Sequence, residues 1–296
     1  MDIPSIDYLL DETAKNGQPI WQVVLREEQH DSGDSQEAIL ERAMHTYEVM
    51  KNAAMSGIAT GMKSVSGLTG GDAATYYNYL RNHKRLLGSM ESKAVAYALG
   101  TSGYNAAMGV VAACPTAGAA GIVPGVLIAA QEEYGFSDRE AVYGLLTASA
   151  IGGVVATRAT ISGAAGGWQA ECGTAAAMAA AALVEVMGGS ARQCVDAAAL
   201  ALKNCLGLAC DPVAGLVEVP CVKRNVIGAM NAVSCADMAL AGCESQVPVD
   251  EVIDAMAEVG RRMPVEFRET ALGGLAATPT GRAVKAKMEE LRLKNT

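Results

Sequence analysis

Two cysteines, Cys210 and Cys221, lie on either side of a loop that contains Pro212, Gly215 and Pro220. Proline and glycine impose fixed turns, so this loop could bring both thiols to one centre. A zinc site would usually show two cysteines separated by two residues, and the chain has no such pair. If a metal is bound, thiolate ligands favour an iron–sulfur cluster. The alternative is a pair of inert thiols, because free cysteine is among the most buried residue types.

Three glycine-containing segments interrupt the apolar part of the chain, at 115–121, 161–168 and 210–221. Each would expose backbone N–H groups beside the start of a helix, which is what a carboxylate or phosphate ligand needs. The alternative is that their small residues only allow helices to cross closely. A further glycine-rich loop, 67–72, could approach a ligand in the same way.

The elements that must position these segments are helices. Of 296 residues, 51% are hydrophobic but only 4% are aromatic, so the core must be built from Ala, Val, Leu, Met and Cys. That composition favours packed helices over a sheet. The sequence predicts an all-α protein, a single compact helical domain over 1–296 whose glycine-rich loops form the site. Helices are expected at 5–16, from Pro19, from Asp34, and near 73–87, 90–102, 120–134, 138–157, 172–188, 190–204, 224–241, 249–261 and 281–293.

Charge divides this domain into parts. Residues 1–50 carry eleven acidic residues against three basic ones, so −8 of the net charge of −9 lies there. We therefore expect an acidic helical outer layer over 1–60, a catalytic helical body over 61–281, and a C-terminal helix and tail over 282–296. Because the chain has no basic stripe, it is a poor candidate for binding nucleic acid.

The location of the protein is expected to be cytoplasmic. The first residues do not have the pattern of a secretory leader, and the eight cysteines are scattered through Ala-rich helical sequence rather than packed into a small disulfide-rich domain. Two long uncharged runs, 94–131 and 141–157, raise the question of a membrane span. Their apolar residues are mostly Ala and Val, broken by Gly and Pro, so we expect buried central helices and no membrane partner.

Five strings in this order resemble the α chain of iron–sulfur-dependent L-serine dehydratase, and the resemblance covers nearly the whole chain from about residue 50. They are SVSGLTGGDA (64–73), NAAMGVVAACPTAGAAGIVPG (105–125), ATISGAAGGWQAECG (159–173), CDPVAGLVEVPCVKRN (210–225) and ETALGGLAATPTG (269–281). The resemblance implies a lyase that converts L-serine to pyruvate and ammonia with a [4Fe–4S] cluster and no pyridoxal phosphate. It also implies a separate β subunit and an oligomeric assembly.

In this family three cysteines bind the cluster, and two of them match Cys210 and Cys221. The third stands in a Gly-Gly-Cys-Gln-Ala-Glu string, where this chain has Trp168. Tryptophan cannot coordinate iron, because its only polar atom is an N–H donor. Cys172, four residues further on, is the candidate third ligand. The alternative is a cluster-deficient, inactive α-type subunit, natural or engineered, that keeps the fold and the β-chain binding.

In the dehydration of serine the β-hydroxyl is a poor leaving group. An iron with one free coordination position could activate it as a Lewis acid. The substrate carboxylate must then be held in place. The candidate groups are the backbone of two segments, two amide side chains and one cation: Thr116, Ala117, Gly118, Ser162, Gly163, Asn105, Asn225 and Arg224. The sequence assigns no base for the α-proton.

Overall fold

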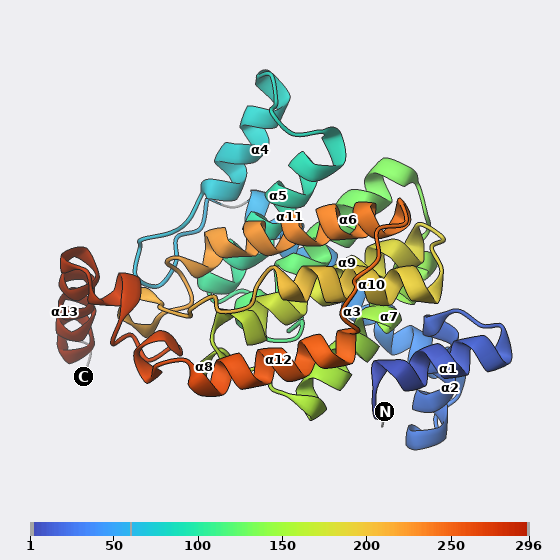
Figure 1. Ribbon diagram of the computed structural model, residues 1–296. Helices are drawn as coiled ribbons and strands as arrows, with labels where there is room; N and C mark the ends of the chain where they lie inside the picture. Colours follow the sequence, from blue (N-terminus) through green and yellow to red (C-terminus); the bar gives the residue numbers. More distant parts are fainter. Residues whose placement is uncertain (1–2, 60, 295–296) are drawn as a thin grey trace.

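The computed structural model describes residues 3–59 and 61–294, and the described residues form one helical domain (Figure 1). Within them there are no strands, only two isolated bridges, Lys63–Gly70 and Cys210–Arg268. The α-helices are α1 (Ile6–Asn16), α2 (Ile20–Ser32), α3 (Gln36–Ala59), α4 (Asp72–Asn82), α5 (Ser89–Ala106), α6 (Ile122–Tyr134), α7 (Asp138–Arg158), α8 (Gly163–Gly166), α9 (Thr174–Val186), α10 (Ala191–Lys203), α11 (Cys221–Leu240), α12 (Val249–Arg262) and α13 (Pro279–Lys294). Five short turns complete the list: η1 (Ala117–Ala119), η2 (Gln169–Gly173), η3 (Val213–Gly215), η4 (Val265–Phe267) and η5 (Gly274–Ala277).

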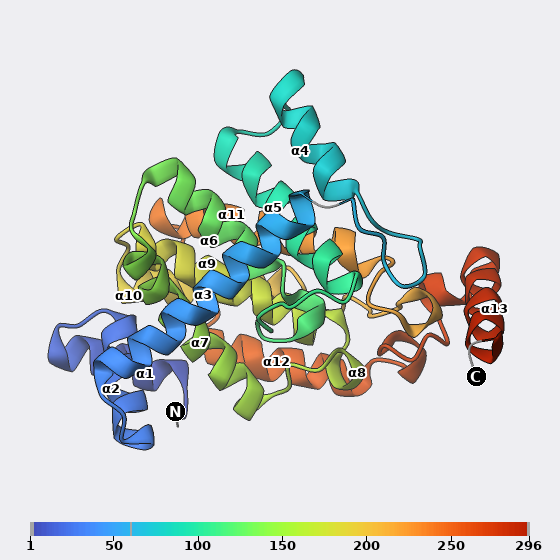
Figure 2. The same ribbon diagram turned by 180° about the vertical axis from the view of Figure 1, so that it is seen from behind.

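Helix α9 is the centre of the domain. Its residues from Thr174 to Val184 are all buried, and it packs against α6, α7, α10 and α11. Most of these side chains are alanine, whose small size lets neighbouring backbones come close. Helix α3 crosses the back of this bundle and packs on α5 and α7, as Figure 2 shows. Residues 3–59 therefore lie on the body, with α1 and α2 near one end of α3 and α4 near its other end.

Local signals set several boundaries as predicted. Ser137 and Ser190 begin α7 and α10, each in a capping box with the residue three positions on. Gly17 and Gly135 end α1 and α6 in the left-handed conformation. Asp250 lies in the first turn of α12, but its side chain binds another helix. Its two carboxylate oxygens accept from the backbone N–H groups of Ile6 at 3.1 Å and Asp7 at 3.0 Å, so it caps α1.

Two predicted boundaries are wrong. Helix α4 ends at Asn82 rather than near 87, and residues 81–88 are all exposed. No residue of that segment is buried, so burial does not add to helix propensity there. Helix α11 begins at Cys221, three residues earlier than expected, directly after the loop from Cys210. Cys221 is therefore the first helical residue rather than part of the loop.

One helix of the described residues, α7, is long and apolar enough by length and composition to cross a membrane. Of its most apolar 18-residue window, 67% is buried inside the protein. The central helix of a globular domain has the same pattern. This accounts for the uncharged run 141–157 as core, and the expectation that no part of the chain crosses a membrane stays a prediction.

The crossing of α3 and α5 depends on two glycines. A Cβ at Gly57 would collide with the backbone of Gly100, so the helices can touch only where both lack a side chain. We expect Gly57→Ala to lower the free energy of unfolding by about 1–3 kcal/mol, because neither backbone can move aside without shifting a whole helix. Gly103→Ala on α5 is the matched control: no atom lies within 4 Å of its new Cβ, so this change is expected to be neutral or stabilising. Urea unfolding of both variants measures the difference, and equal stability of the two would contradict the close crossing.

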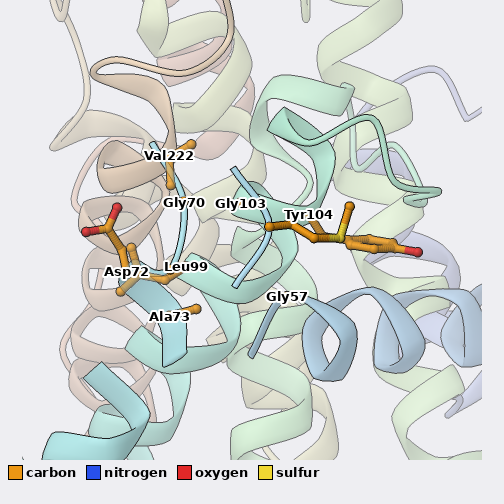
Figure 3. A pocket seen from close by; sticks show the side chains of 10 residues that line it. Gly57, Gly70, Asp72, Ala73, Leu99, Gly103, Tyr104 and Val222 are labelled. Carbon is orange, nitrogen blue, oxygen red and sulfur yellow. The ribbon is translucent and has the colours of Figure 1, made fainter. Parts of the chain in front are cut away.

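A small cavity beside this crossing is lined by Gly57, Gly70, Leu99 and Val222, among others, as Figure 3 shows. Its volume is about 10 Å³, roughly the size of a single water. That volume is too small for an amino acid.

Candidate active site

The thiols of Cys172, Cys210 and Cys221 are buried, and the charges of the last two act on the pKa of Cys172. All three cysteines are free and less than 9% exposed. Burial raises the pKa of Cys172 well above its usual value, and the charges of Glu171, Cys221 and Cys210 raise it further. Burial also raises the pKa of Cys221 to about 12. Cys205 contributes to the same rise, and the turn that carries Cys172 packs against α11, the helix that begins at Cys221.

A turn of π-helix positions Cys172. Residues Gln169–Gly173 form this turn directly before α9, and all of them are buried. A π turn closes i→i+5 rather than i→i+4, so it changes which side chains share a face, and such turns occur frequently at functional sites. The sequence interpretation assumed an ordinary helical turn between Trp168 and Cys172. The π turn replaces that geometry and also carries Glu171 into the site.

The cysteine loop is held in place by backbone pairing and one ion pair. The backbone N–H of Cys210 donates to Phe267 O at 2.8 Å, and that of Glu269 donates back to Cys210 O at 2.7 Å. Arg224 Nη1 donates to Asp211 Oδ1 at 2.6 Å and to Ala209 O at 3.1 Å. Arg224 was a candidate for the substrate carboxylate, but here its guanidinium is engaged by the loop that carries Cys210.

Trp168 is 2% exposed and belongs to the hydrophobic core. Among the described residues its Nε1–H has no hydrogen-bond partner. Its indole offers no lone pair to a metal, so its contribution is volume in the core. Cys172 is therefore the candidate for the third ligand within the string 168–172.

The donor set is suited to an iron–sulfur cluster. Among the described residues no group of three or more His, Cys, Asp or Glu is arranged to hold a single metal ion. A four-iron cluster has a different requirement, because each ligand sulfur binds its own iron and the sulfurs stand correspondingly apart. Thiolates are the ligands that such a cluster takes, so the chemistry of these three side chains fits it. Gly163 lies against Cys210, because an added Cβ would lie 3.4 Å from Cys210 Sγ and 3.0 Å from Glu269 Oε2.

Glu171 is a site residue that the sequence interpretation missed. Its carboxylate accepts a hydrogen bond from Thr116 Oγ1, and it lies against two glycines. A Cβ at Gly118 would lie 3.0 Å from Glu171 Cδ, and one at Gly163 would lie 3.3 Å from Glu171 Oε2. Burial raises the pKa of this carboxyl, the Thr116 hydrogen bond opposes the rise, and the charge of Glu269 adds to it. The string Gln-Ala-Glu-Cys contained the signal, since it places an acid beside a candidate ligand.

The turn η1, with Ala117 and Gly118, is oriented by two asparagines. Asn105 Nδ2 donates to Ala117 O at 3.0 Å, and Asn225 Nδ2 donates to Gly118 O at 2.8 Å. In a trans peptide the N–H points opposite to the C=O. The N–H groups of Gly118 and Ala119 therefore point away from these asparagines.

Asn225 has no free amide hydrogen for a substrate in this structure. Besides Gly118 O, its Nδ2 donates to Cys221 O at 3.0 Å, and its Oδ1 accepts from Gly121 N at 3.0 Å. The side chain is fully buried. These contacts tie the first turn of α11, with Cys221, to the segment 117–121. Ser162, the remaining candidate, is exposed and stands before Gly163 at the start of α8.

The glycine-rich loop 61–71 joins the site through Glu218. The backbone N–H of Ser66 donates to Glu218 Oε1 at 3.1 Å, and Ser66 Oγ donates to Glu218 Oε2. Glu218 is 4% exposed and belongs to the loop between Cys210 and Cys221. The structure thus brings segments 61–71, 115–121, 161–173 and 210–225 together at the three thiols, although they are far apart in the sequence.

Comparison with known proteins supports the resemblance stated from the sequence. The family described as serine dehydratase alpha chain matches residues 15–276. A "Probable L-serine dehydratase, alpha chain" of Bacillus subtilis is 49% identical over 284 residues, 96% of this chain and 94% of that protein. An "L-serine dehydratase, alpha chain" of Peptoniphilus asaccharolyticus is 44% identical over 277 residues, 94% of this chain and 95% of that protein. An L-serine dehydratase of Escherichia coli is 46% identical over 183 residues, which are 61% of this chain but only 40% of that protein. The chain belongs to the serine dehydratase alpha chain family.

Proposed function

We propose that this chain is the alpha subunit of an L-serine dehydratase, a lyase that eliminates water from L-serine to give pyruvate and ammonia. The observation that carries the proposal is the convergence of Cys172, Cys210 and Cys221 beside Glu171 in a chain of this family. We further propose that these three thiols hold a [4Fe–4S] cluster. When bound, the cluster would supply a Lewis-acidic iron for the leaving hydroxyl.

The protein's own groups account for substrate placement. The N–H groups of Gly118 and Ala119, turned away from Asn105 and Asn225, are donors of the kind that a carboxylate accepts. Gly163 lies beside the same groups, because a Cβ there would come within 3.4 Å of Glu171, Glu269 and Cys210. Asn225 acts as a positioning residue, since its contacts hold the turn and the start of α11 in register.

Glu171 is the group that we propose to accept the α-proton. Its carboxylate is buried, bounded by Gly118 and Gly163, and aligned by the Thr116 hydroxyl. A base near the substrate carbon needs this kind of fixed orientation. Glu269 faces the same space from the loop after α12 and is half-buried.

A separate beta subunit completes the enzyme in this proposal, and the assembly is an oligomer. The relatives named alpha chain match this chain nearly end to end, whereas the Escherichia coli protein extends well beyond it. The extra sequence of that longer protein must correspond to another chain if this one is part of a two-subunit enzyme. All eight cysteines are free, which suits a reducing, cytoplasmic location.

The alternative function is an inactive alpha-type subunit without a cluster. It rests on Trp168 standing where the family pattern has cysteine. The present contacts favour the active form, because Cys172 supplies a third buried thiol and Trp168 lies in the core.

The test is pyruvate formation from L-serine by the chain co-expressed with its beta chain under anaerobic conditions. Turnover is expected with the pair, and it should disappear after removal of iron by a chelator and return when iron and sulfide are restored. A pair that holds its full cluster and still makes no pyruvate would contradict the proposed activity.

A further inference from the structure

An exposed apolar surface lies beside the loop between Cys210 and Cys221. Six large apolar side chains in three segments are 41–80% exposed. They are Val65 and Leu68 in the loop before α4, Met108 and Val110 in the loop after α5, and Leu272 and Leu275 in the loop before α13. We call these six residues the apolar rim. Contiguous exposed apolar surface of this kind marks interaction sites in proteins.

Hydrogen bonds join the three segments of the apolar rim around the cysteine loop. The N–H of Val65 donates to Ala106 O at 3.3 Å, which places the first segment beside the second. Ser66 binds Glu218, and the N–H of Leu275 donates to Asp211 Oδ2 at 2.7 Å. Both acceptors belong to the loop between Cys210 and Cys221. Figures 1 and 2 agree that the loop before α4 descends toward α13 at the same end of the molecule.

The backbone of the rim is strained where its apolar side chains are most exposed. Met108 has φ of 66° and Ala271, next to Leu272, has φ of 55°. A left-handed conformation is uncommon for residues with a side chain, and it tends to persist at binding and active sites. In Met108 this conformation presents an apolar side chain to solvent.

We infer that the apolar rim is the docking surface for the beta subunit, which would close the thiol site from solvent. This inference rests on the proposed function and adds the surface that the partner uses. The relatives support the occupant: the chain covers nearly all of the alpha chains but 40% of the longer Escherichia coli protein. The additional protein mass must therefore bind to some face of this fold. The rim is apolar, and its segments are hydrogen-bonded to the loop that carries the cysteines. A partner bound there would exclude water from the proposed site.

Another exposed apolar site among the described residues is the segment 83–88 between α4 and α5. Leu86 is 101% exposed there, but its neighbours Lys84 and Arg85 are cationic and the segment is remote from the thiols. It lacks the continuity with the site that the rim has. Leu86 therefore serves as the matched control position.

The experiment compares Val110→Lys, Leu272→Lys and Leu86→Lys, each expressed and purified without the beta chain. Calorimetric titration of purified beta chain into each variant is expected to give about 30-fold weaker binding for the two rim variants. Leu86→Lys should bind as the parent does, and all three should contain the same iron as the parent. Unchanged binding in both rim variants, or equal loss in Leu86→Lys, would overturn the inference.

Two further outcomes are distinct from these. If sedimentation of the chain alone shows that rim variants dissociate a homodimer while beta-chain binding is unaffected, the rim is a self-association surface and the inference is wrong. Failure of the proposed function would appear in the parent itself, as absence of iron and of pyruvate formation, whatever the rim variants do.

Discussion

Cys172→Ala is expected to purify without bound iron or sulfide and to have no activity. The parent chain, purified under anaerobic conditions, is expected to be brown. The thiol of Cys172 is the only one in the 168–172 string, and the charges of Cys210 and Cys221 contribute to the rise of its pKa. With two ligands, a cluster has lost a protein bond that fixes its position. Iron and sulfide analysis together with visible absorption measures the change, and we expect loss of nearly all bound iron.

Cys194→Ala is the matched control for this change. Cys194 is as buried as Cys172 and its pKa is likewise raised by burial, but Glu185 rather than another thiol is its charged neighbour. It should keep full iron content. Cys205 provides a sharper comparison, because its thiolate also raises the pKa of Cys172. If Cys205→Ala lost the cluster and Cys172→Ala kept it, the third ligand would be Cys205 and the assignment of Cys172 would be wrong.

Glu171→Gln is expected to lower kcat by about 10²–10⁴-fold while iron content stays at the parent value. Glutamine keeps the shape and can still accept the hydrogen bond from Thr116, but it cannot take a proton from carbon. Because the change removes a step rather than a binding contact, KM for L-serine should change much less than kcat. Steady-state kinetics of the variant with the beta chain, beside an iron assay, measures both quantities.

Glu185→Gln is the control for the loss of a buried carboxylate. Glu185 on α9 also accepts from a threonine hydroxyl, that of Thr147 at 2.7 Å, and burial also raises its pKa. It lies where α7 and α9 meet and takes no part in the thiol site, so its variant should retain parental kcat. A Glu171→Gln enzyme with parental kcat would contradict the assignment of the base.

The helices could be predicted from the sequence because their signals are local. Ser137 with Glu140, Ser190 with Gln193, and Gly135 each satisfy backbone groups within a few residues. The glycine-containing segments could also be predicted to lie close together. A side chain at Gly118 or Gly163 would press on Glu171, so these positions require glycine. Asp250 is a case that local signals do not predict. An acidic residue in the first turn of α12 would be expected to cap that helix, but Asp250 caps α1, 243 residues away in the sequence.

The parts that could not be predicted depend on contacts between distant segments. Whether Arg224 and Asn225 meet a substrate or the protein is decided by Asp211, Gly118 and Gly121, which no local pattern couples to them. The π turn at Cys172 is similar, because it is one added residue in a helix and has no distinctive composition. The added residue of the π turn changes which side chains of the string 168–172 share one face of the helix.

The most direct test of this account is the iron and sulfide content of the unmodified chain, purified without oxygen and reconstituted, measured beside Trp168→Cys. The account predicts about four irons per chain in the parent, with no gain from the new cysteine, because Cys172 already supplies the third sulfur. A colourless parent without iron that becomes brown and iron-loaded as Trp168→Cys would contradict it. In that case the tryptophan, rather than its neighbour, would decide whether the cluster forms.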